Sequence, residues 1–362
     1  MKKQHMLRLE PRNRQSLWAA WLSPLLALLL TAITGGVIFW AMGKDPGTAL
    51  YIYFVEPLTS SSGLSEVAVK AGPLILIGIG LSFGFRANIW NIGAEGQYIA
   101  GAITGGGLAV YWHDSTSSLL LPAMVMTGIL GGMLWAAIPA FLKSRFNANE
   151  ILVSLMLVYI AELLLVHLVQ GPWRNPMGWG FPGTRMFPDV AQLPLLFPGK
   201  RIHLGTVLTL AIPFIAWFIL SRTRFGFQIR LFGSAPSAAR HAGVKSDRVI
   251  WQSLLIGGAL AGLAGVIEVT GTIGQLMPDI SPGYGFTAII VAFLGRLHPM
   301  GVLLAGIAIA VTYIGGEGAQ ISAGLPKAVT GLFQGIILFY LLAFDLFTRY
   351  KIVLTSRQTA QQ

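Results

Sequence analysis

The chain has 362 residues, of which 54% are hydrophobic and only 11% are charged, and its formal net charge is +11. A soluble domain carries about 25% charged residues, so this composition predicts a protein embedded in lipid. The Lys and Arg residues stand singly between apolar runs, which excludes the basic stripe of a nucleic-acid-binding surface. The absence of cysteine excludes disulfides, thiolate metal sites and cysteine nucleophiles.

A helix needs about 20 mostly apolar residues to cross the hydrocarbon core of a bilayer. The first apolar run follows a basic segment, is too long for a signal-peptide core and has no clear cleavage site, so it is interpreted as a retained membrane helix. We predict an all-α, polytopic membrane protein with about ten transmembrane helices, near 17–42, 66–85, 94–112, 118–142, 150–170, 204–221, 249–271, 285–296, 300–316 and 326–347.

The distribution of Lys and Arg predicts the orientation, because these residues favour cytoplasmic segments. With the N-terminus inside, eighteen of the 25 cations fall on the cytoplasmic side; the remaining seven are Lys44, Lys70, Arg174, Arg185, Lys200, Arg201 and Lys327. We therefore expect a multi-pass protein of a bacterial cytoplasmic (inner) membrane with both termini in the cytoplasm. The expected divisions are a basic cytoplasmic segment at 1–16, a transmembrane domain at 17–347 and a cytoplasmic tail at 348–362.

Two loops stand out by length. The outer loop, 171–203, is rich in Pro and Trp, which suits either a docking surface or a rigid plug at the membrane interface. The inner loop, 222–248, contains a helix-forming stretch from Ser237 to Ala242, flanked by Pro236 and Gly243. This loop predicts one short helix lying outside the membrane.

Two blocks of the sequence have the same predicted organisation. Residues 66–170 and 249–347 each hold four spans, and the two blocks start on opposite sides of the membrane. Many transporters consist of two halves with inverted topology, whose helices are interrupted at matching positions. Here the interruptions are Ala87 to Gln97 and Gly274 to Phe286. Because the halves share no convincing sequence identity, the repeat is a hypothesis from topology alone.

Enzymatic motifs are missing from the sequence. It has no GxxxxGK[ST] phosphate loop, no HExxH and no GxSxG, and its six His residues are too dispersed for a metal site. We therefore expect no catalytic residues, no bound metal and no ATP hydrolysis by this chain. Uphill transport would need a partner or an ion gradient.

Three acidic residues fall inside or beside predicted spans, where charge is costly: Glu95, Glu162 and Glu268. Their scatter does not form a proton relay, and a polar contact between helices is the favoured interpretation for Glu162 and Glu268. Glu95 differs because glycines and polar side chains surround it. The candidate solute pathway is the set Asn88, Asn91, Glu95, Gln97 and Tyr98.

Uncharged amides suit hydroxyl-rich or heterocyclic solutes, which need directional hydrogen bonds without a full countercharge. Amides can also cap helix ends, and neighbouring glycines can permit close helix packing. The residues alone leave both interpretations of this cluster open.

Three ordered segments resemble a known family: FRANIWNIGAEGQYIAGA (Phe85 to Ala102), NEILVSLMLVYIA (Asn149 to Ala161) and AARHAGVKSDRVIWQSLLIGGALAGLAGVIEV (Ala238 to Val269). They resemble the permease subunits of ABC importers in the branched-chain amino acid, ribose and nucleoside group, and most closely its nucleoside and simple-sugar branch. The resemblance implies that the helix around Ser234 to Val244 is a coupling helix that contacts an ATPase. The residues concerned are Ser234, Pro236, Ser237, Ala239, Arg240, His241 and Gly243.

The same resemblance implies the remaining parts of the machine. These are a cytoplasmic ATPase that binds ATP and Mg, a second permease of the same or a different chain, and an extracytoplasmic substrate-binding protein. Residues 17–347 would then be a permease domain that translocates a nucleoside or simple sugar by alternating access. The alternative is an ion-coupled secondary transporter of a small polar solute that depends on carboxylates such as Glu95 or Glu268. A membrane-embedded enzyme for lipid-linked substrates is disfavoured because catalytic groups are not clustered.

Overall fold

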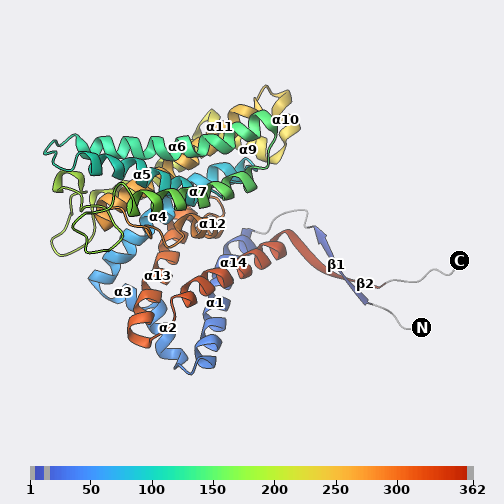
Figure 1. Ribbon diagram of the computed structural model, residues 1–362. Coiled ribbons are helices and arrows are strands. Elements are labelled where there is room, and N and C mark those ends of the chain that lie inside the picture. Colours follow the sequence, from blue (N-terminus) through green and yellow to red (C-terminus); the bar gives the residue numbers. More distant parts are fainter. Residues whose placement is uncertain (1–4, 12–16, 357–362) are drawn as a thin grey trace. The chain divides into compact units, whose positions relative to one another are not determined.

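The computed structural model describes residues 5–11 and 17–356 (Figure 1). The chain divides into two compact units, residues 56–315 and residues 1–55 with 316–362, and the boundary falls within one long helix, α13 (Pro299–Ala323). Each unit is described by itself below. Of the cations predicted to lie inside, Lys2, Lys3, Arg12, Arg14 and Arg357 are outside the described residues.

The unit formed by residues 56–315 consists of helices, and its longest connection is the outer loop, 171–203. Its elements are α3 (Glu56–Thr59), α4 (Ser61–Arg86), α5 (Ala94–Tyr111), α6 (Leu120–Phe146), α7 (Glu150–Gln170), the 3₁₀-helix η1 (Asp189–Ala191), α8 (Leu204–Arg222), α9 (Arg224–Ser234), α10 (Pro236–His241), α11 (Ser246–Ile267), the π-helix η2 (Glu268–Ile273), α12 (Tyr284–Leu294) and the first part of α13.

Helix α4 is at the centre of this unit. From Gly72 to Phe85 every residue of α4 is buried, and α8, α11 and α12 pack around it. Helices α6 and α11 cross with their backbones in contact, because a Cβ at Gly132 would overlap the carbonyl oxygen of Gly258. Such close approach of small residues is how helices associate in lipid, where the hydrophobic effect gives no driving force between them.

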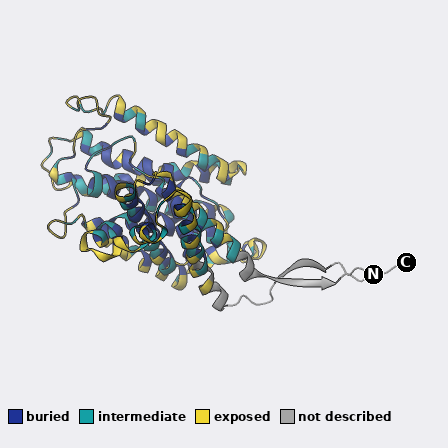
Figure 2. Cartoon of the chain, turned by 90° about the horizontal axis from the view of Figure 1, so that it is seen from below, coloured by how far each residue is buried: buried dark blue, intermediate teal, exposed yellow. Residues whose placement is uncertain are grey.

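The unit formed by residues 1–55 and 316–362 contains α1 (Leu17–Ala41), α2 (Pro46–Phe54), the end of α13, α14 (Ala328–Arg349), and the antiparallel strands β1 (His5–Pro11) and β2 (Tyr350–Ser356). Its core is a stack of rings in which the Phe333 centroid lies 4.6 Å from Tyr53 and 5.3 Å from Phe39. Figure 2 shows the general pattern, in which buried and exposed residues alternate along most helices.

The predicted helical, multi-pass membrane protein is confirmed. Each of the ten predicted spans coincides with a described helix. Among the described residues, six helices are long and apolar enough to cross a membrane by length and composition: α4, α6, α7, α8, α11 with η2, and α13. Shorter apolar helices are Leu25–Ala41, Tyr284–Leu294 and Ala328–Phe344.

Two features of the fold were not predicted. Asp45 caps helix α2 by accepting a hydrogen bond from the Thr48 N–H, and Pro46 is the first residue of the helix. Both are helix start signals that the sequence displays. The strand pair joins the two segments predicted as tails, with His5 opposite Ser356. Pairing between chain ends about 350 residues apart depends on tertiary proximity, which local patterns do not encode.

Candidate functional site

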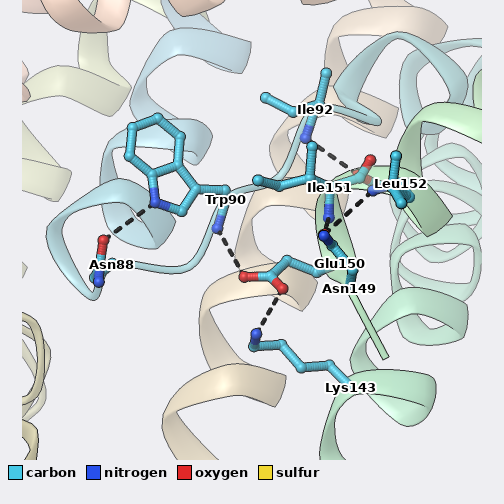
Figure 3. A network of polar contacts seen from close by, with 9 residues as sticks. Asn88, Trp90, Ile92, Lys143, Asn149, Glu150, Ile151 and Leu152 are labelled. Carbon is cyan, nitrogen blue, oxygen red and sulfur yellow. Dashed lines mark hydrogen bonds and ion pairs between the residues drawn. The ribbon is translucent and has the colours of Figure 1, made fainter. Parts of the chain in front are cut away.

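The first non-helical segment, residues 87–93, follows α4 and runs along the start of α7. The Trp90 N–H donates to Glu150 Oε1 at 3.4 Å and the Ile92 N–H donates to Ser154 Oγ at 3.2 Å, while Lys143 forms an ion pair with Glu150 at 2.5 Å (Figure 3). A helix rises 1.5 Å per residue, so the chain climbs about 6 Å along α7 between these two bonds. Helix α5 therefore begins inside the bundle, above the level where α4 ends.

A pair of buried amides braces this segment. Asn91 Nδ2 donates to Gln97 Oε1 at 2.9 Å, Gln97 Nε2 donates to Asn91 Oδ1 at 3.1 Å, and the Gly93 N–H also donates to Asn91 Oδ1. Asn88 differs from the other predicted pathway residues because it is exposed, with a backbone φ of 57° and its Oδ1 accepting from the Trp90 indole N–H. The amides thus satisfy one another and fix the entry into α5.

The second non-helical segment, residues 274–283, follows η2 and descends along α5. Leu276 packs against Gly106, the Tyr98 hydroxyl donates to the Ile280 carbonyl at 3.1 Å, and the Gly285 N–H donates to Glu95 Oε2 at 2.5 Å. From Gly106 to Glu95 is about 16 Å along α5. The chain therefore returns into the bundle in non-helical form before α12 starts.

This descent corrects the predicted span at 285–296. Helix α12 has 11 residues, a length of about 16 Å, whereas the hydrocarbon core is about 30 Å thick. The non-helical segment covers the remaining depth. Its end is capped by Ser281, whose hydroxyl accepts from the N–H groups of Gly283 and Tyr284 at 3.1 and 3.0 Å.

The two segments meet at Glu95 and Gly285. Glu95 is 3% exposed, and its carboxylate lies at the N-terminus of α12, where the helix dipole favours negative charge. A Cβ at Gly285 would stand 2.6 Å from Glu95 Cα, so only glycine permits this approach. A ladder of rings continues from the junction, with 5.9 Å between the centroids of Tyr98 and Tyr284 and again between Tyr284 and Tyr313.

Irregular backbone at membrane depth is tolerated only where protein buries it or where it lines a cavity. In many transporters built from inverted repeats, interruptions at matching positions lie near the binding site. Here each interruption follows the first helix of its sequence block, α4 in one and α11 in the other. The structure thus brings Glu95 and Tyr98 to the junction of the two interruptions, while Gln97 braces Asn91 beside it.

Lys70, assigned to the outer side, falls inside the predicted span at 66–85. Helix α4 begins at Ser61, so Lys70 lies about 14 Å along the helix. Its Nζ is 5.7 Å from the centroid of the Tyr284 ring. A cation within an apolar span is a functional-site signal.

The outer loop is hydrogen-bonded to η2 and to the second segment. Thr184 and Leu276 exchange two bonds of 3.0 Å, and the Phe187 N–H donates to the Gly274 carbonyl at 2.7 Å. The Leu193 N–H donates to Thr270 O at 2.9 Å. His203, 2% exposed, packs against Gly271; burial, reinforced by the Arg201 charge, lowers the pKa of His203 to about 4.

The inner loop differs from the prediction of one helix because it contains two, α9 and α10. Thr223 caps α9 by accepting from the Gly226 N–H at 3.2 Å. Gly233 approaches α4 so closely that a Cβ there would overlap the Arg86 carbonyl oxygen. A glycine often indicates a helix break in a sequence, but Gly233 here permits close contact between α9 and the end of α4.

Most of the predicted coupling residues lie on the surface of the α9–α10 corner. The exposed ones are Ser234, Pro236, Ser237, Arg240, His241 and Gly243, and His241 Nδ1 lies 2.8 Å from the Ser237 carbonyl oxygen. Ala239 is the exception, since it is fully buried. A bulky residue at Ala239 would therefore disturb the corner itself.

A separate pocket in this unit is lined by none of the predicted site residues and by no His, Cys, Asp or Glu. A pocket of about 280 Å³ is lined by the apolar side chains of Met133, Phe225, Leu255, Ile256 and Ala259, together with Gln252. Among residues 5–11 and 17–356, no three His, Cys, Asp or Glu side chains are placed to hold a metal ion.

Comparisons with known proteins agree on one family. The model of the branched-chain amino acid transport system / permease component family matches residues 63–342. The glucose ABC transporter permease protein TsgB13 of Haloferax volcanii is 37% identical over 356 residues, covering 96% of this chain and 93% of that protein.

Two further relatives are nucleoside permeases. The guanosine ABC transporter permease protein NupP of Bacillus subtilis is 30% identical, covering 88% of this chain and 92% of that protein. The nucleoside ABC transporter permease protein NupB of Lactococcus lactis is 26% identical over 88% of this chain and 90% of that protein. The chain belongs to the branched-chain amino acid transport system / permease component family, and is a permease subunit of an ABC transporter.

Proposed function

We propose that this permease translocates a nucleoside or a simple sugar by alternating access, driven by a partner ATPase that binds ATP and Mg. The observation that carries the proposal is the junction of two interrupted spans at Glu95 and Gly285. Its carboxylate and tyrosines are groups that offer directional hydrogen bonds and aromatic faces. Relatives named for glucose, guanosine and nucleoside transport support this solute class.

The motor contact is proposed at the α9–α10 corner. Arg240 and His241 are exposed there, available for polar contacts with a partner groove. The same corner contacts the end of α4 through Gly233 and Arg86, and residues 87–93 follow directly. If an ATPase displaces the corner, the movement would therefore reach the start of the first segment, at residue 87.

The outer loop is proposed as the surface for an extracytoplasmic substrate-binding protein, in preference to a plug. Its hydrogen bonds to Gly274 and Leu276 connect a docking event to the second segment. A second permease, of the same or a different chain, completes the transporter.

Uptake measurements in proteoliposomes test the function. Proteoliposomes contain the complete importer, and D-glucose or guanosine is added outside together with the binding protein. A second sample carries the same complex with a hydrolysis-deficient ATPase. Uptake that needs ATP hydrolysis supports the proposal. Uptake that persists without hydrolysis and collapses with an ionophore supports the ion-coupled alternative.

Replacing Arg240 with Ala tests the motor contact. Because Arg240 is exposed, the change is expected to alter unfolding free energy by less than about 0.5 kcal/mol. Solute-stimulated ATPase activity should fall several-fold while the complex stays assembled. Normal coupled uptake in the variant would mean that another surface contacts the ATPase.

Both termini are proposed to lie in the cytoplasm. The β1–β2 pairing places residues 5–11 beside 350–356, which requires both segments to be on one side of the membrane. Because the chain has no cysteine, a single cysteine at Thr355 can be labelled without background. Labelling by an impermeant maleimide in intact cells would contradict a cytoplasmic location.

A further inference from the structure

The pocket of about 280 Å³ has no role in the function proposed above. Its lining comes from α6 through Met133, from α9 through Phe225 and from α11, and Gln252 is the polar residue of that lining. The Gln252 Oε1 is buried and accepts no hydrogen bond from a residue that the structure describes. A buried acceptor without a partner carries a desolvation cost. A molecule that enters the pocket and donates a hydrogen bond to Gln252 removes this cost.

The face of α11 that borders the pocket changes from charged to apolar along the helix. Arg248, Gln252 and Ile256 follow one another at intervals of four residues, so they lie on one face, about 6 Å apart along the axis. Arg248 is exposed and is the nearest of the three to the start of α11. The apolar part continues to Ala259. A phospholipid has the same order, with a charged head group, hydrogen-bonding groups and then acyl chains.

The polar end of the pocket lies at the level of lipid head groups. The apolar span formed by α11 and η2 starts at Ser246, and Gln252 follows six residues later, about 9 Å along the axis. Each head-group layer is about 5–8 Å thick, and long helical side chains lean toward the N-terminus of their helix. The Gln252 amide is therefore within reach of head groups, whereas Ala259 lies beside acyl chains. That this is the cytoplasmic leaflet rests on the proposed function.

The charge around the polar end of the pocket favours an anionic lipid. Residues 222–251 carry six Lys or Arg side chains and one acidic side chain, Asp247. Arg224 is exposed and directly precedes Phe225, which lines the pocket. Each basic residue near a membrane surface strengthens the binding of anionic lipid by about fivefold. A lipid with a negative net charge therefore fits this site better than a zwitterionic one.

We propose that this pocket binds an anionic phospholipid whose head group carries hydroxyl groups, of the phosphatidylglycerol type. Arg248 binds the phosphate, the Gln252 Oε1 accepts a hydrogen bond from a head-group hydroxyl, and one acyl chain lies along Ile256 and Ala259. Phosphatidylcholine lacks both features, because its head group has no net charge and no hydrogen-bond donor. The bound lipid connects α9, which leads into the proposed motor contact, with α6 and α11.

Photo-crosslinking in the complete importer tests the lipid site. The importer is reconstituted in phosphatidylcholine nanodiscs with a trace of phosphatidylglycerol or phosphatidylcholine that carries a diazirine in its acyl chain, and no solute or ATP is added. Mass spectrometry compares labelling of residues 252–259 with labelling around Leu163, which is 70% exposed on α7 and reports bulk lipid. We expect this labelling ratio to be higher for the phosphatidylglycerol probe by about fivefold or more.

Variants of the pocket separate its contacts from general attraction to the membrane. Arg248→Gln and Gln252→Leu should each reduce the preference for phosphatidylglycerol several-fold. Arg174→Gln, which removes an exposed cation of the outer loop, is the matched control and should leave the preference unchanged. Ile256→Trp fills the pocket and should remove labelling of residues 252–259 by both probes. Leu304→Trp, on an exposed position of α13, is its control and should leave that labelling unchanged.

The outcomes of this experiment decide the inference separately from the proposed function. Equal labelling ratios for the two probes in the wild-type importer overturn the anionic lipid. Labelling around Leu163 without labelling of residues 252–259 means that a partner chain covers the pocket, which also overturns the lipid site. If Gln252→Leu prevents assembly, Arg248→Gln and competition by unlabelled phosphatidylglycerol against phosphatidylcholine decide. Failure to transport a sugar or nucleoside would contradict the proposed function but would not alter the labelling.

Discussion

The two non-helical segments reach the same junction but are held in different ways. Residues 87–93 are fastened to α7 by side chains, through Glu150 and Ser154, and are braced by the Asn91–Gln97 amide pair. Residues 274–283 are attached mainly to the outer loop, through backbone bonds at Gly274 and Leu276. The first segment is therefore held within the helix bundle, whereas the second is bonded to both α5 and the outer loop.

The difference assigns separate roles to the two faces of the protein. The α9–α10 corner contacts the root of the first segment, and the outer loop contacts the root of the second. Coupling through packed elements requires that each has two discrete arrangements that both sites can bias. Glu95 and Tyr98 form hydrogen bonds with the 280–285 stretch across the junction, and under the proposed function the two inputs converge there.

The largest expected effect follows from filling the junction. Gly285→Ala places a Cβ against the Glu95 backbone and should destabilise the fold by about 1–3 kcal/mol and abolish uptake. Thermal unfolding in detergent and uptake in proteoliposomes measure both effects. Gly331→Ala in α14 is the control, since a Cβ there meets nothing within 4 Å. If Gly285→Ala and Gly331→Ala show equal stability and equal uptake, the junction is not required for transport.

Next in size is the attachment of the second segment. Thr184→Val keeps the side-chain shape but removes the oxygen that accepts the Leu276 N–H, at a cost of about 1–3 kcal/mol for the unsatisfied donor. We expect uptake to fall several-fold while basal ATPase activity is unchanged. Full uptake in this variant would show that the outer loop does not control the second segment.

Acid should weaken the contact between His203 at the end of the outer loop and Gly271 in η2. The pKa of His203 is lowered from its ordinary 6.5 to about 4 by burial and by Arg201. The unfolded chain therefore binds the proton first, so the stability that neutral His203 contributes is complete above pH 6.5 and is lost as pH falls toward 4. The loss reaches about 3 kcal/mol. Thermal unfolding should show this acid dependence in the wild-type protein and a smaller one in His203→Asn.

The smallest effect on transport is expected in the first segment. Ser154→Ala removes the acceptor of the Ile92 N–H and should cost about 1 kcal/mol of stability. Uptake should remain within a factor of two, because α7, the amide pair and Glu150 still hold residues 87–93. If Ser154→Ala lost as much uptake as Thr184→Val, the two segments would not differ in their importance for transport.

Most of the fold could be predicted because long apolar runs specify membrane helices without reference to the rest of the chain. The two interruptions were also visible, since ANIWNIGAEGQ and GQLMPDISPGYGF break the apolar pattern with Gly, Pro and polar residues. The apolar periodicity did not show how deep in the membrane the two segments lie. Their depth depends on the helices along which they run, and only the contacts of Trp90 and Leu276 reveal these helices.

The candidate site was predicted in part. Glu95 and Tyr98 reach the junction, and Asn91 and Gln97 brace it, whereas Asn88 lies exposed beside Trp90. The contact of Lys70 with the Tyr284 ring could not be predicted, because the two residues are more than 200 positions apart in the chain. Such juxtapositions result from packing, and residue spacing does not encode them.

The most direct test of the central claim is the distance between the two segments during the ATPase cycle. Cysteines introduced at the exposed positions Asn88 and Asp279 can carry spin labels. Pulsed electron paramagnetic resonance then measures the distance between the labels in the complete importer. The account predicts that ATP binding by the partner changes this distance and that the hydrolysis-deficient complex holds it in one state. An identical distance distribution with and without ATP, in a complex that still transports, would contradict it.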